Sequence, residues 1–458
     1  MKTLVKIAAF TAALAGSSAA FAADVSSAAV SGRWDAVLTR NGTEIPFRLD
    51  IKGSGADLQG VFYDGFKPYD GTTNASFKDG KLVLNIEHYL TTINATLKDG
   101  ALDGAVVAQN RESSANYGFH AVRHVDTAST TTGPSIAGTW VIPLDAPSSK
   151  GERAFRLIVQ QQGPEVAASI LRIDGDTGSY SGSFKDGKWV LSHFDGGRPG
   201  VITVTPGPDG TLKVVQLLSR PAGAAAQPAA YTATAQTVAA GNAYAADATP
   251  DGRYASTLTA YRQEVAQAKG LPAPEDFLTH TTVRDPNETF AFNFKDFDGK
   301  PVSNEDPRFK NKVVLAIVTG TWCPNCHDEA QYLVQLDKKY RDKGLAIVAL
   351  DFEEPEQQAS QQRARAFIKK YGVKYTYLNA GAPAEMWEKV PQLNHLDTWP
   401  ATVFVGRDGK VAAVHSGFAS PASAEFHEQL KEEFTARIEK LLAQRVASND
   451  LGTRWLAP

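Results

Sequence analysis

The strongest constraint on the fold is a sharp change of pattern between residues 313 and 340. Residues 313–318, Val-Val-Leu-Ala-Ile-Val, form a short, mostly β-branched apolar run bounded by Lys312 and Gly320. Such a run predicts a strand that is buried on both faces. Apolar side chains then recur at roughly helical spacing among charged ones, at Ala330, Leu333, Val334, Leu336 and Tyr340. The sequence therefore predicts a buried strand that passes directly into an amphipathic helix.

The only two cysteines of the chain, Cys323 and Cys326, lie at this junction. Backbone N–H groups and the positive end of the helix macrodipole stabilise a thiolate at the start of a helix. We therefore expect Cys323 to be the exposed, deprotonated nucleophile. Cys326, one turn into the helix, would resolve a mixed disulfide, so the two form a redox-active disulfide. Pro324 suits the first helical turn, where its missing N–H would have no partner.

Three other uses of the cysteines stay open. Residues 323–327 also match the Cys-x-x-Cys-His motif that attaches c-type haem, with Met386 as the only methionine besides Met1 to offer a distal ligand. A zinc site would need four ligands, and the chain has no second cysteine pair. A purely structural disulfide would close so small a loop that it would constrain the unfolded chain little. We expect neither a metal nor a cofactor.

The N-terminus has the pattern of a cleavable export signal. Residues 1–6 carry two lysines, an apolar stretch follows through Ala15, and Ala20-Phe21-Ala22 fits an Ala-x-Ala cleavage site. We expect a signal peptide over residues 1–22, no lipid anchor, and a periplasmic mature protein. No other run reaches about 18 apolar residues, so no stable membrane insertion is expected. A chain with only two cysteines that is exported to an oxidising compartment does not rely on disulfides for general stability. We therefore expect the pair to be redox-active rather than structural.

The composition is that of an ordinary globular protein, with 43% hydrophobic and 21% charged residues. The formal net charge is only -3. Basic residues are scattered along the chain, so there is no electrostatic case for binding nucleic acid or an anionic membrane.

The region before residue 236 repeats itself. Three pairs of segments keep an offset of 106 to 108 residues: 32–34 with 138–140, 47–49 with 155–157, and 76–81 with 183–188. Asp-Gly pairs lie between short alternating stretches, which is typical of tight hairpins. We expect two all-β antiparallel modules, over residues 30–126 and 134–236, each closed as a barrel or sandwich. Trp34 and Trp140 are expected in their cores, although the modules could also form a docking surface or a dimer interface.

The rest of the chain predicts an α/β domain over residues 276–447, between a linker (237–275) and a tail (448–458). The linker is expected to hold a short helix over Arg253 to Lys269. An antiparallel hairpin should precede the buried strand. Further strands are expected over residues 344–350, 375–378, 401–405 and 410–414, and helices over 362–371 and 422–445. The order βαβα, strand, hairpin, helix predicts a sheet with an antiparallel pair at one end.

Several motifs of this domain occur together. They include Trp-Cys-Pro-Asn-Cys at 322–326, Lys-Gly-Leu at 343–345 and Trp-Pro-Ala-Thr-Val-Phe-Val at 399–405. With them, the stretch from about Glu288 to Leu442 resembles the thioredoxin fold, and more narrowly the TlpA/ResA group of exported thiol-disulfide oxidoreductases. The resemblance covers about a third of the chain. The two N-terminal β modules lie outside it, so we expect a multidomain protein in which they precede a thioredoxin-like α/β domain.

The resemblance also implies roles for individual residues. Pro400 matches the cis-proline beside the cysteine pair, where Trp399 would offer backbone groups to a substrate peptide as an added strand. Trp322 would shield the thiolate. The implied substrate-binding set is Trp322, Pro324, Trp399 and Pro400.

Glu329 and His327 are polar residues of the predicted helix. Glu329 matches a glutamate that this group carries near its cysteines. It lies about one turn beyond Cys326, where a carboxylate could relay a proton to the thiol. The alternative is a solvated helix residue. His327 is expected on the helix surface. Ile317 stands where thioredoxin has a buried acid, six positions before the first cysteine.

The implied reaction is dithiol-disulfide exchange with protein substrates. Most relatives of this kind are reductants and need electrons from a membrane-bound thiol donor, so we expect that direction. One alternative is a peroxiredoxin-like (AhpC/TSA-like) peroxidase, although Gly320 and Ala316 stand where that pattern has a threonine and a proline. Another is an adaptor protein whose β modules carry the main function. Deletion of residues 30–236 would discriminate between an adaptor and a redox enzyme.

Overall fold

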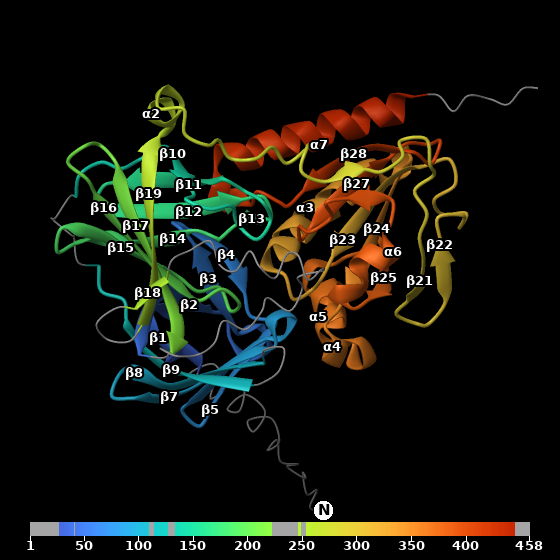
Figure 1. Cartoon of the computed structure of the whole chain (residues 1–458). Helices are drawn as coiled ribbons and strands as arrows, with labels where there is room; N and C mark the ends of the chain where they lie inside the picture. The colour runs from blue at the N-terminus through green and yellow to red at the C-terminus, as the bar shows by residue number, and fades with distance from the viewer. Residues whose placement is uncertain are drawn as a thin grey trace, which may run out of the picture.

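The computed structural model describes residues 27–40, 42–109, 114–126, 133–221, 246–248 and 253–444. Two antiparallel β sheets precede an α/β domain, which confirms the predicted fold class (Figure 1). The predicted signal peptide (1–22) and the predicted tail (448–458) lie outside the described residues. Among the residues described, no helix is both long and apolar enough to cross a membrane.

The first sheet has nine strands in the order β4-β3-β2-β1-β9-β8-β7-β6-β5. Alternating burial along β6 puts Leu82, Leu84 and Ile86 into its core, as expected for a sheet that is covered on one face. No ladder joins β4 to β5 within the described part of the chain. The sheet is therefore a half-barrel rather than a closed one. Its strands are β1 (Gly32–Arg40), β2 (Thr43–Lys52), β3 (Gln59–Asp64), β4 (Lys67–Gly71), β5 (Asn74–Lys78), β6 (Lys81–Ile86), β7 (Thr91–Lys98), β8 (Ala101–Gln109) and β9 (Ser114–Arg123), with the 3-10 helices η1 (Gly55–Asp57) and η2 (Glu87–Tyr89).

The second sheet closes into a barrel, because β19 pairs with both β17 and β10. Its strands are β10 (Gly138–Pro143), β11 (Ala154–Gln162), β12 (Glu165–Arg172), β13 (Gly175–Asp176), β14 (Tyr180–Lys185), β15 (Lys188–His193), β16 (Gly200–Pro206), β17 (Leu212–Pro221), β18 (Ala246–Ala248) and β19 (Arg253–Arg262).

The expected linker helix over Arg253 to Lys269 is wrong for its first ten residues, which form β19. Only α2 (Gln263–Ala268) is helical. The pattern has a period of two here, since Leu258 and Ala260 turn inward while the β-branched Thr257 and Thr259 are exposed. Burial against the barrel core selects the strand. A deletion that ends at residue 236 would thus leave β19 without its barrel.

Trp34 of the first module and Trp140 of the second pack in the same way. The indole N–H of Trp34 and that of Trp140 each donate to a backbone carbonyl four residues earlier, at 2.8 and 2.9 Å. A guanidinium covers each ring, with Arg123 4.2 Å from the Trp34 centroid and Arg262 3.8 Å from that of Trp140. Both tryptophans are buried in module cores, as expected.

The α/β domain contains a seven-stranded sheet in the order β22-β21-β25-β24-β23-β27-β28, and the predicted order of its elements is confirmed. Strands β23, β24 and β25 are parallel, and the others run antiparallel to their neighbours. The strands are β21 (Asn293–Asp296), β22 (Pro301–Ser303), β23 (Val313–Thr319), β24 (Leu345–Phe352), β25 (Thr376–Gly381), β27 (Ala401–Val405) and β28 (Val411–Ser416), with β20 (Thr282–Val283) paired to β26 (Leu393–Asn394) apart from them. The helices are α3 (Pro324–Tyr340), α4 (Pro355–Ser360), α5 (Gln362–Tyr371), α6 (Met386–Lys389) and α7 (Glu425–Ala443), with the 3-10 turns η3 (Arg341–Lys343), η4 (Pro383–Glu385) and η5 (Pro421–Ser423).

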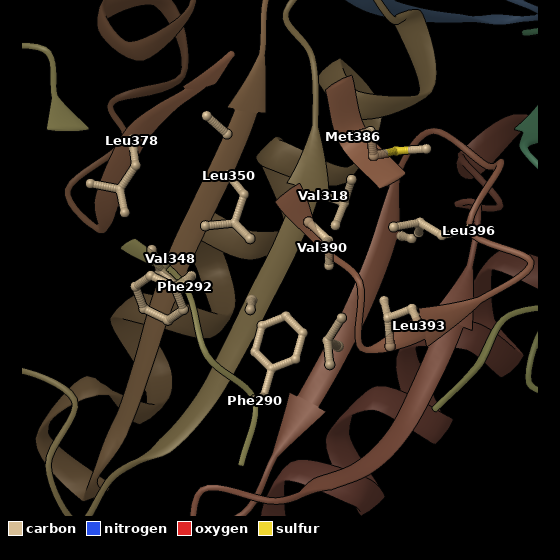
Figure 2. Close-up of a cluster of buried hydrophobic side chains, with 14 of the residues drawn as sticks. Phe290, Phe292, Val318, Val348, Leu350, Leu378, Met386, Val390, Leu393 and Leu396 are labelled. Carbon is tan, nitrogen blue, oxygen red and sulfur yellow. The ribbon is translucent and has the colours of Figure 1, made fainter. Parts of the chain in front are cut away.

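Strand β23 is buried at every position, as its apolar run predicts. Its odd-numbered residues pack under α3 and α7, in a cluster with Leu333 and Phe434. Its even-numbered residues face the opposite cluster, which Figure 2 shows with Val318 beside Leu350, Met386 and Leu396. The cysteine motif follows the end of this central strand and is therefore held by the core on both faces.

Candidate active site

The two cysteines lie where β23 gives way to α3. Cys323 is the N-cap of α3, and Pro324 is its first residue. The backbone N–H of Cys326 donates to the Cys323 carbonyl at 3.0 Å, which winds the pair into one turn. Both are free thiols.

Cys323 is not exposed as expected, since only 4% of it is accessible. Its Sγ donates a hydrogen bond to the Trp399 carbonyl at 3.3 Å. The rings of Trp322 and Trp399 meet edge to face, 5.1 Å apart, and Trp322 is fixed by a hydrogen bond from its indole N–H to the Phe352 carbonyl at 2.9 Å. Trp399, which completes this cover, lies at the end of a distant loop, so helical spacing around the cysteines does not reveal the burial of Cys323.

Cys326 is 2% exposed. Burial, reinforced by a hydrogen bond with Cys323 and by the charge of that neighbour, raises the pKa of the Cys326 thiol well above its ordinary value. Cys326 is thus held as a neutral thiol beneath Cys323.

The peptide bond between Trp399 and Pro400 is cis, as predicted. Strand β27 begins at the next residue and pairs with β23, so this loop is fixed beside the motif. Cys323, Cys326 and Trp399 share one buried cluster, against which Trp322 packs. The structure therefore brings together the cysteines and the predicted aromatic and proline positions.

Glu329 is fully buried, so the solvated alternative is wrong. One carboxylate oxygen accepts a hydrogen bond from the Thr402 hydroxyl, and the other has no hydrogen-bond partner among the described residues. Burial raises the pKa of Glu329 to about 8. Tyr375 is close enough to Glu329 and Cys326 for their charges, after burial, to raise its own pKa. Glu329 and Cys326 thus border the same buried region.

A second buried acid, Asp351, was missed. It lies in β24 opposite Thr319 of β23, and neither of its carboxylate oxygens has a partner in hydrogen-bond geometry within the described chain. Burial, with repulsion from Glu353, raises the pKa of Asp351 well above its ordinary value. The sequence held a signal, because Asp351 directly follows the apolar run 344–350, for which a buried strand is predicted.

The neighbouring acids fix the loop before the motif. Glu353 accepts hydrogen bonds from the backbone N–H of Thr321 at 2.9 Å and from Arg363 at 2.7 Å. Arg363 also binds Glu354 at 2.9 Å. Residue Thr321, just before the cysteines, is therefore anchored to the end of β24.

His327 is not on the surface as expected, since only 1% of it is exposed. Its Nε2 lies 2.8 Å from the Thr321 carbonyl oxygen, and its Nδ1 lies 2.9 Å from the Tyr371 hydroxyl. Its ring centroid lies 4.4 Å from that of Tyr89, which belongs to the half-barrel, with the two rings tilted by 35°. Burial lowers the pKa of His327 well below its ordinary value. With both nitrogens engaged, the ring is unsuited to bind a haem iron.

The next residue, Asp328, is also tied to both β modules. It accepts a hydrogen bond from Arg198 of the second barrel at 3.0 Å and another from the Tyr69 hydroxyl of the half-barrel. Lys370 of α5 pairs with Asp70 at 2.8 Å. Residues 326–330 of α3 are thus buried without exception. No group of three or more His, Cys, Asp or Glu side chains in the described ranges is arranged to hold a metal ion.

Comparison with known proteins agrees with this geometry. Residues 282–430 match the Redoxin family. The chain is 27% identical over 150 residues to the thiol-disulfide oxidoreductase ResA of Bacillus thuringiensis (strain Al Hakam), covering 33% of this chain and 74% of the relative. It is 30% identical over 128 residues to the thioredoxin-like protein YneN of Bacillus subtilis (strain 168), covering 28% of this chain and 68% of the relative.

A solved thiol:disulfide interchange protein of the thioredoxin family from Chlorobium tepidum is 21% identical, over 35% of this chain and 99% of that chain, with a TM-score of 0.27. A TM-score this low adds nothing to the assignment. The family match and the sequence relatives suffice: through residues 282–430 the chain belongs to the Redoxin family, as a ResA-like thiol-disulfide oxidoreductase of the thioredoxin fold.

Proposed function

We propose that this protein is a periplasmic reductant that exchanges disulfides with protein substrates through Cys323 and Cys326. One observation carries the proposal: a free thiol at the N-cap of α3 contacts the carbonyl of Trp399, with a second, buried thiol directly beneath it. The export signal expected at residues 1–22 and the kinship with ResA support the compartment.

The reaction balances without a cofactor. The Cys323 thiolate attacks one sulfur of a substrate disulfide, forms a mixed disulfide and releases the other substrate sulfur as a thiolate. Cys326 then loses its proton and attacks the Cys323 sulfur, which releases the reduced substrate and leaves a Cys323–Cys326 disulfide. Two electrons pass to the substrate in each cycle. A membrane-bound thiol donor must return them.

Glu329 has a role in the second step. The Cys326 thiol is held protonated by burial, so its attack needs a base at the same depth. Glu329 is fully buried about one helical turn further along α3, with a pKa raised to about 8 and one oxygen without a hydrogen-bond partner among the described residues. A carboxyl group with that pKa can take the proton and return it near neutral pH. Asp351 is a second, similarly buried acid at the end of β24.

Substrate contacts fall to Trp322, Pro324, Trp399 and Pro400. The backbone of Trp399 faces Cys323, so an extended segment paired with it would present its sulfur to the nucleophile. The reducing direction is favoured because a raised thiol pKa makes Cys326 a poor leaving group from the oxidised pair. We also propose that the second module extends to Arg262, where β19 ends.

Trapping tests the proposal. Cys326→Ser should accumulate mixed disulfides with periplasmic proteins that dithiothreitol releases, whereas Cys323→Ser should accumulate none. The reduction potential of the pair, measured in glutathione buffers by thiol alkylation, should lie near about -270 mV, as for thioredoxin. A potential near about -120 mV would identify an oxidant. Equal trapping by the two variants would refute the assigned roles.

A further inference from the structure

A turn of the second barrel lies directly on the cysteine motif. The carbonyl oxygen of Asp174, between β12 and β13, accepts a hydrogen bond from the side-chain amide of Asn325 at 3.2 Å and another from the backbone N–H of Phe418 at 3.1 Å. Gly175 forms an isolated parallel bridge with Phe418. Figure 1 shows β13 reaching from the barrel toward α3. A residue between the two cysteines is therefore covered by the barrel.

The turn is anchored rather than merely adjacent. The buried carboxylate of Asp176 accepts hydrogen bonds from the backbone N–H of Ser420 at 2.7 Å, from its hydroxyl at 2.9 Å and from the Ser423 hydroxyl at 2.6 Å. Gly175 has a φ of +125°, and a Cβ there would collide with the Phe418 carbonyl. Such a close approach of two backbones needs glycine.

A neighbouring barrel loop, residues 147–151, is joined to the same turn. Glu152 accepts hydrogen bonds from the backbone N–H of Ile173 at 2.7 Å and from the Ser148 hydroxyl at 3.0 Å. Lys150 pairs with Asp174. The loop and the turn therefore form one wall beside the active site.

Opposite this wall runs the segment that leads to Trp399. A cleft of about 500 Å³ separates loop 147–151 from Trp387 and residues 393–397. Leu393 and Leu396, labelled in Figure 2, belong with Cys323 to a single buried cluster, against which Trp387 packs. The cleft wall therefore belongs to the same apolar core as the nucleophile, and its last residue, Asp397, precedes Trp399 by two positions.

The chemistry of the cleft suits an extended polypeptide. Of its charged side chains, Lys150 pairs with Asp174, Asp397 binds His280 at 2.7 Å, and Arg284 donates to the side chain of Asn394. The remaining contacts are apolar or neutral and polar. No cluster of like charges among the lining residues would select a small ion. The volume lies within the range of specific ligand clefts.

We propose that the second barrel forms part of the substrate-binding site. The β12–β13 turn closes the Asn325 side of the motif, and a disulfide-bearing segment of a substrate polypeptide lies in the cleft between residues 147–151 and 393–397 on its way to Cys323. This inference rests on the proposed function and adds the path of the substrate.

Filling the cleft tests the path. Ser149 and Asn394 are exposed on its opposite walls, so Ser149→Trp and Asn394→Trp each place a large ring in it. Reduction of insulin and of 2-hydroxyethyl disulfide is measured with dithiothreitol as the electron source. Each variant should lower kcat/KM for insulin about tenfold more than kcat/KM for the small disulfide. Ser183→Trp, at an exposed position of the same barrel outside the cleft, should change neither.

The outcomes separate the two proposals. Equal losses for both disulfides, or unchanged insulin reduction in a cleft variant that folds normally by circular dichroism, would overturn the path through the cleft. The two cleft variants lie on different domains, so misfolding of one leaves the other to decide. A wild-type protein that reduces neither disulfide would instead refute the proposed function.

Discussion

Arg198 of the second barrel lies 3.0 Å from Asp328, measured from Nη1 to Oδ2, two residues beyond Cys326. Arg198 also pairs with a second carboxylate, since its Nε lies 2.8 Å from Asp195 Oδ2. Burial raises the pKa of Asp328 to about 7, while the charge of Arg198 opposes that rise. The helix that carries the cysteine pair is thus held electrostatically by a domain more than a hundred residues away in the sequence.

Replacing Arg198 should lower the free energy of unfolding. Arg198→Met leaves two buried carboxylates without their cation, and breaking a buried pair from one side costs about 3 kcal/mol or more. We expect a loss of that size in the free energy of unfolding, measured by urea denaturation. Arg308→Met is the control, because its pair with Asp306 is partly exposed and should contribute under about 1 kcal/mol. Similar losses in both variants would show that Arg198 does not hold the interface.

The sequence predicts one side of α3 and not the other. The apolar stripe and the junction with β23 follow from periodicity, and so does the place of the cysteines. The expectation that His327 lies on the helix surface is wrong, and Asp328 beside it is buried as well. Tyr89 covers His327, and Tyr69 and Arg198 bind Asp328. These three residues are distant along the chain and leave no local pattern. Polar groups that bury one another across a domain interface look like surface residues in sequence.

In the second barrel, the sequence predicts most of the β structure but not the strand that closes it. The Asp-Gly turns and the repeated tryptophan predict its β character. Its closing strand, β19, follows a stretch rich in Ala, Thr and Pro, and the period-two pattern there is short. Pairing with β10 and β17 makes this segment a strand, and both partner strands are distant from it in sequence. Strand pairing over such separations is set by tertiary packing rather than by local propensity.

Glu329 should make stability depend on pH. Its pKa is raised in the folded protein, from an ordinary 4.5 to about 8, so the folded state favours the neutral acid. This stabilisation is complete below about pH 4.5 and is lost as the pH rises toward 8. Relative to wild type, Glu329→Gln should therefore gain about 4 kcal/mol of unfolding free energy between pH 5 and 8. Glu432→Gln, exposed on α7, should show no such gain. A constant difference between Glu329→Gln and wild type over this range would contradict the raised pKa.

The same group should shape the reaction rate. If Glu329 takes the proton of Cys326, the release of reduced substrate from the mixed disulfide should show an inflection near pH 8. Stopped-flow measurement of that step should find the inflection in wild type and not in Glu329→Gln. The first attack, by Cys323, should keep its pH profile in the variant. Loss of both steps alike would indicate a structural role only.

His327 should be neutral and locked in one tautomer. A carbonyl cannot donate, so the contact with Thr321 requires a proton on Nε2, and Nδ1 then accepts from the Tyr371 hydroxyl. Nitrogen–proton NMR correlations should show the Nε2–H form unchanged from pH 5 to 8. Tyr371→Phe should leave Nδ1 without its donor and cost about 1 kcal/mol of stability. A ring that titrates near pH 6.5 would contradict the buried placement.

Gly175 should be sensitive to a single methyl group because the barrel turn meets the rim of the active site there. In Gly175→Ala the new Cβ would collide with the Phe418 carbonyl and press on Asn325. The matched control is Gly187→Ala, which also has a positive φ, +78°, but has nothing within 4 Å of its Cβ. Gly187→Ala carries only the backbone cost of alanine at positive φ, about 1 to 2 kcal/mol. Gly175→Ala should lose at least about 2 kcal/mol more, because its φ lies outside the left-handed helical region and because the new Cβ is overpacked. It should also expose the 172–176 turn to limited proteolysis. If the two variants lose the same stability and resist protease equally, the turn does not pack tightly on the motif, and the barrel does not cover that side of the active site.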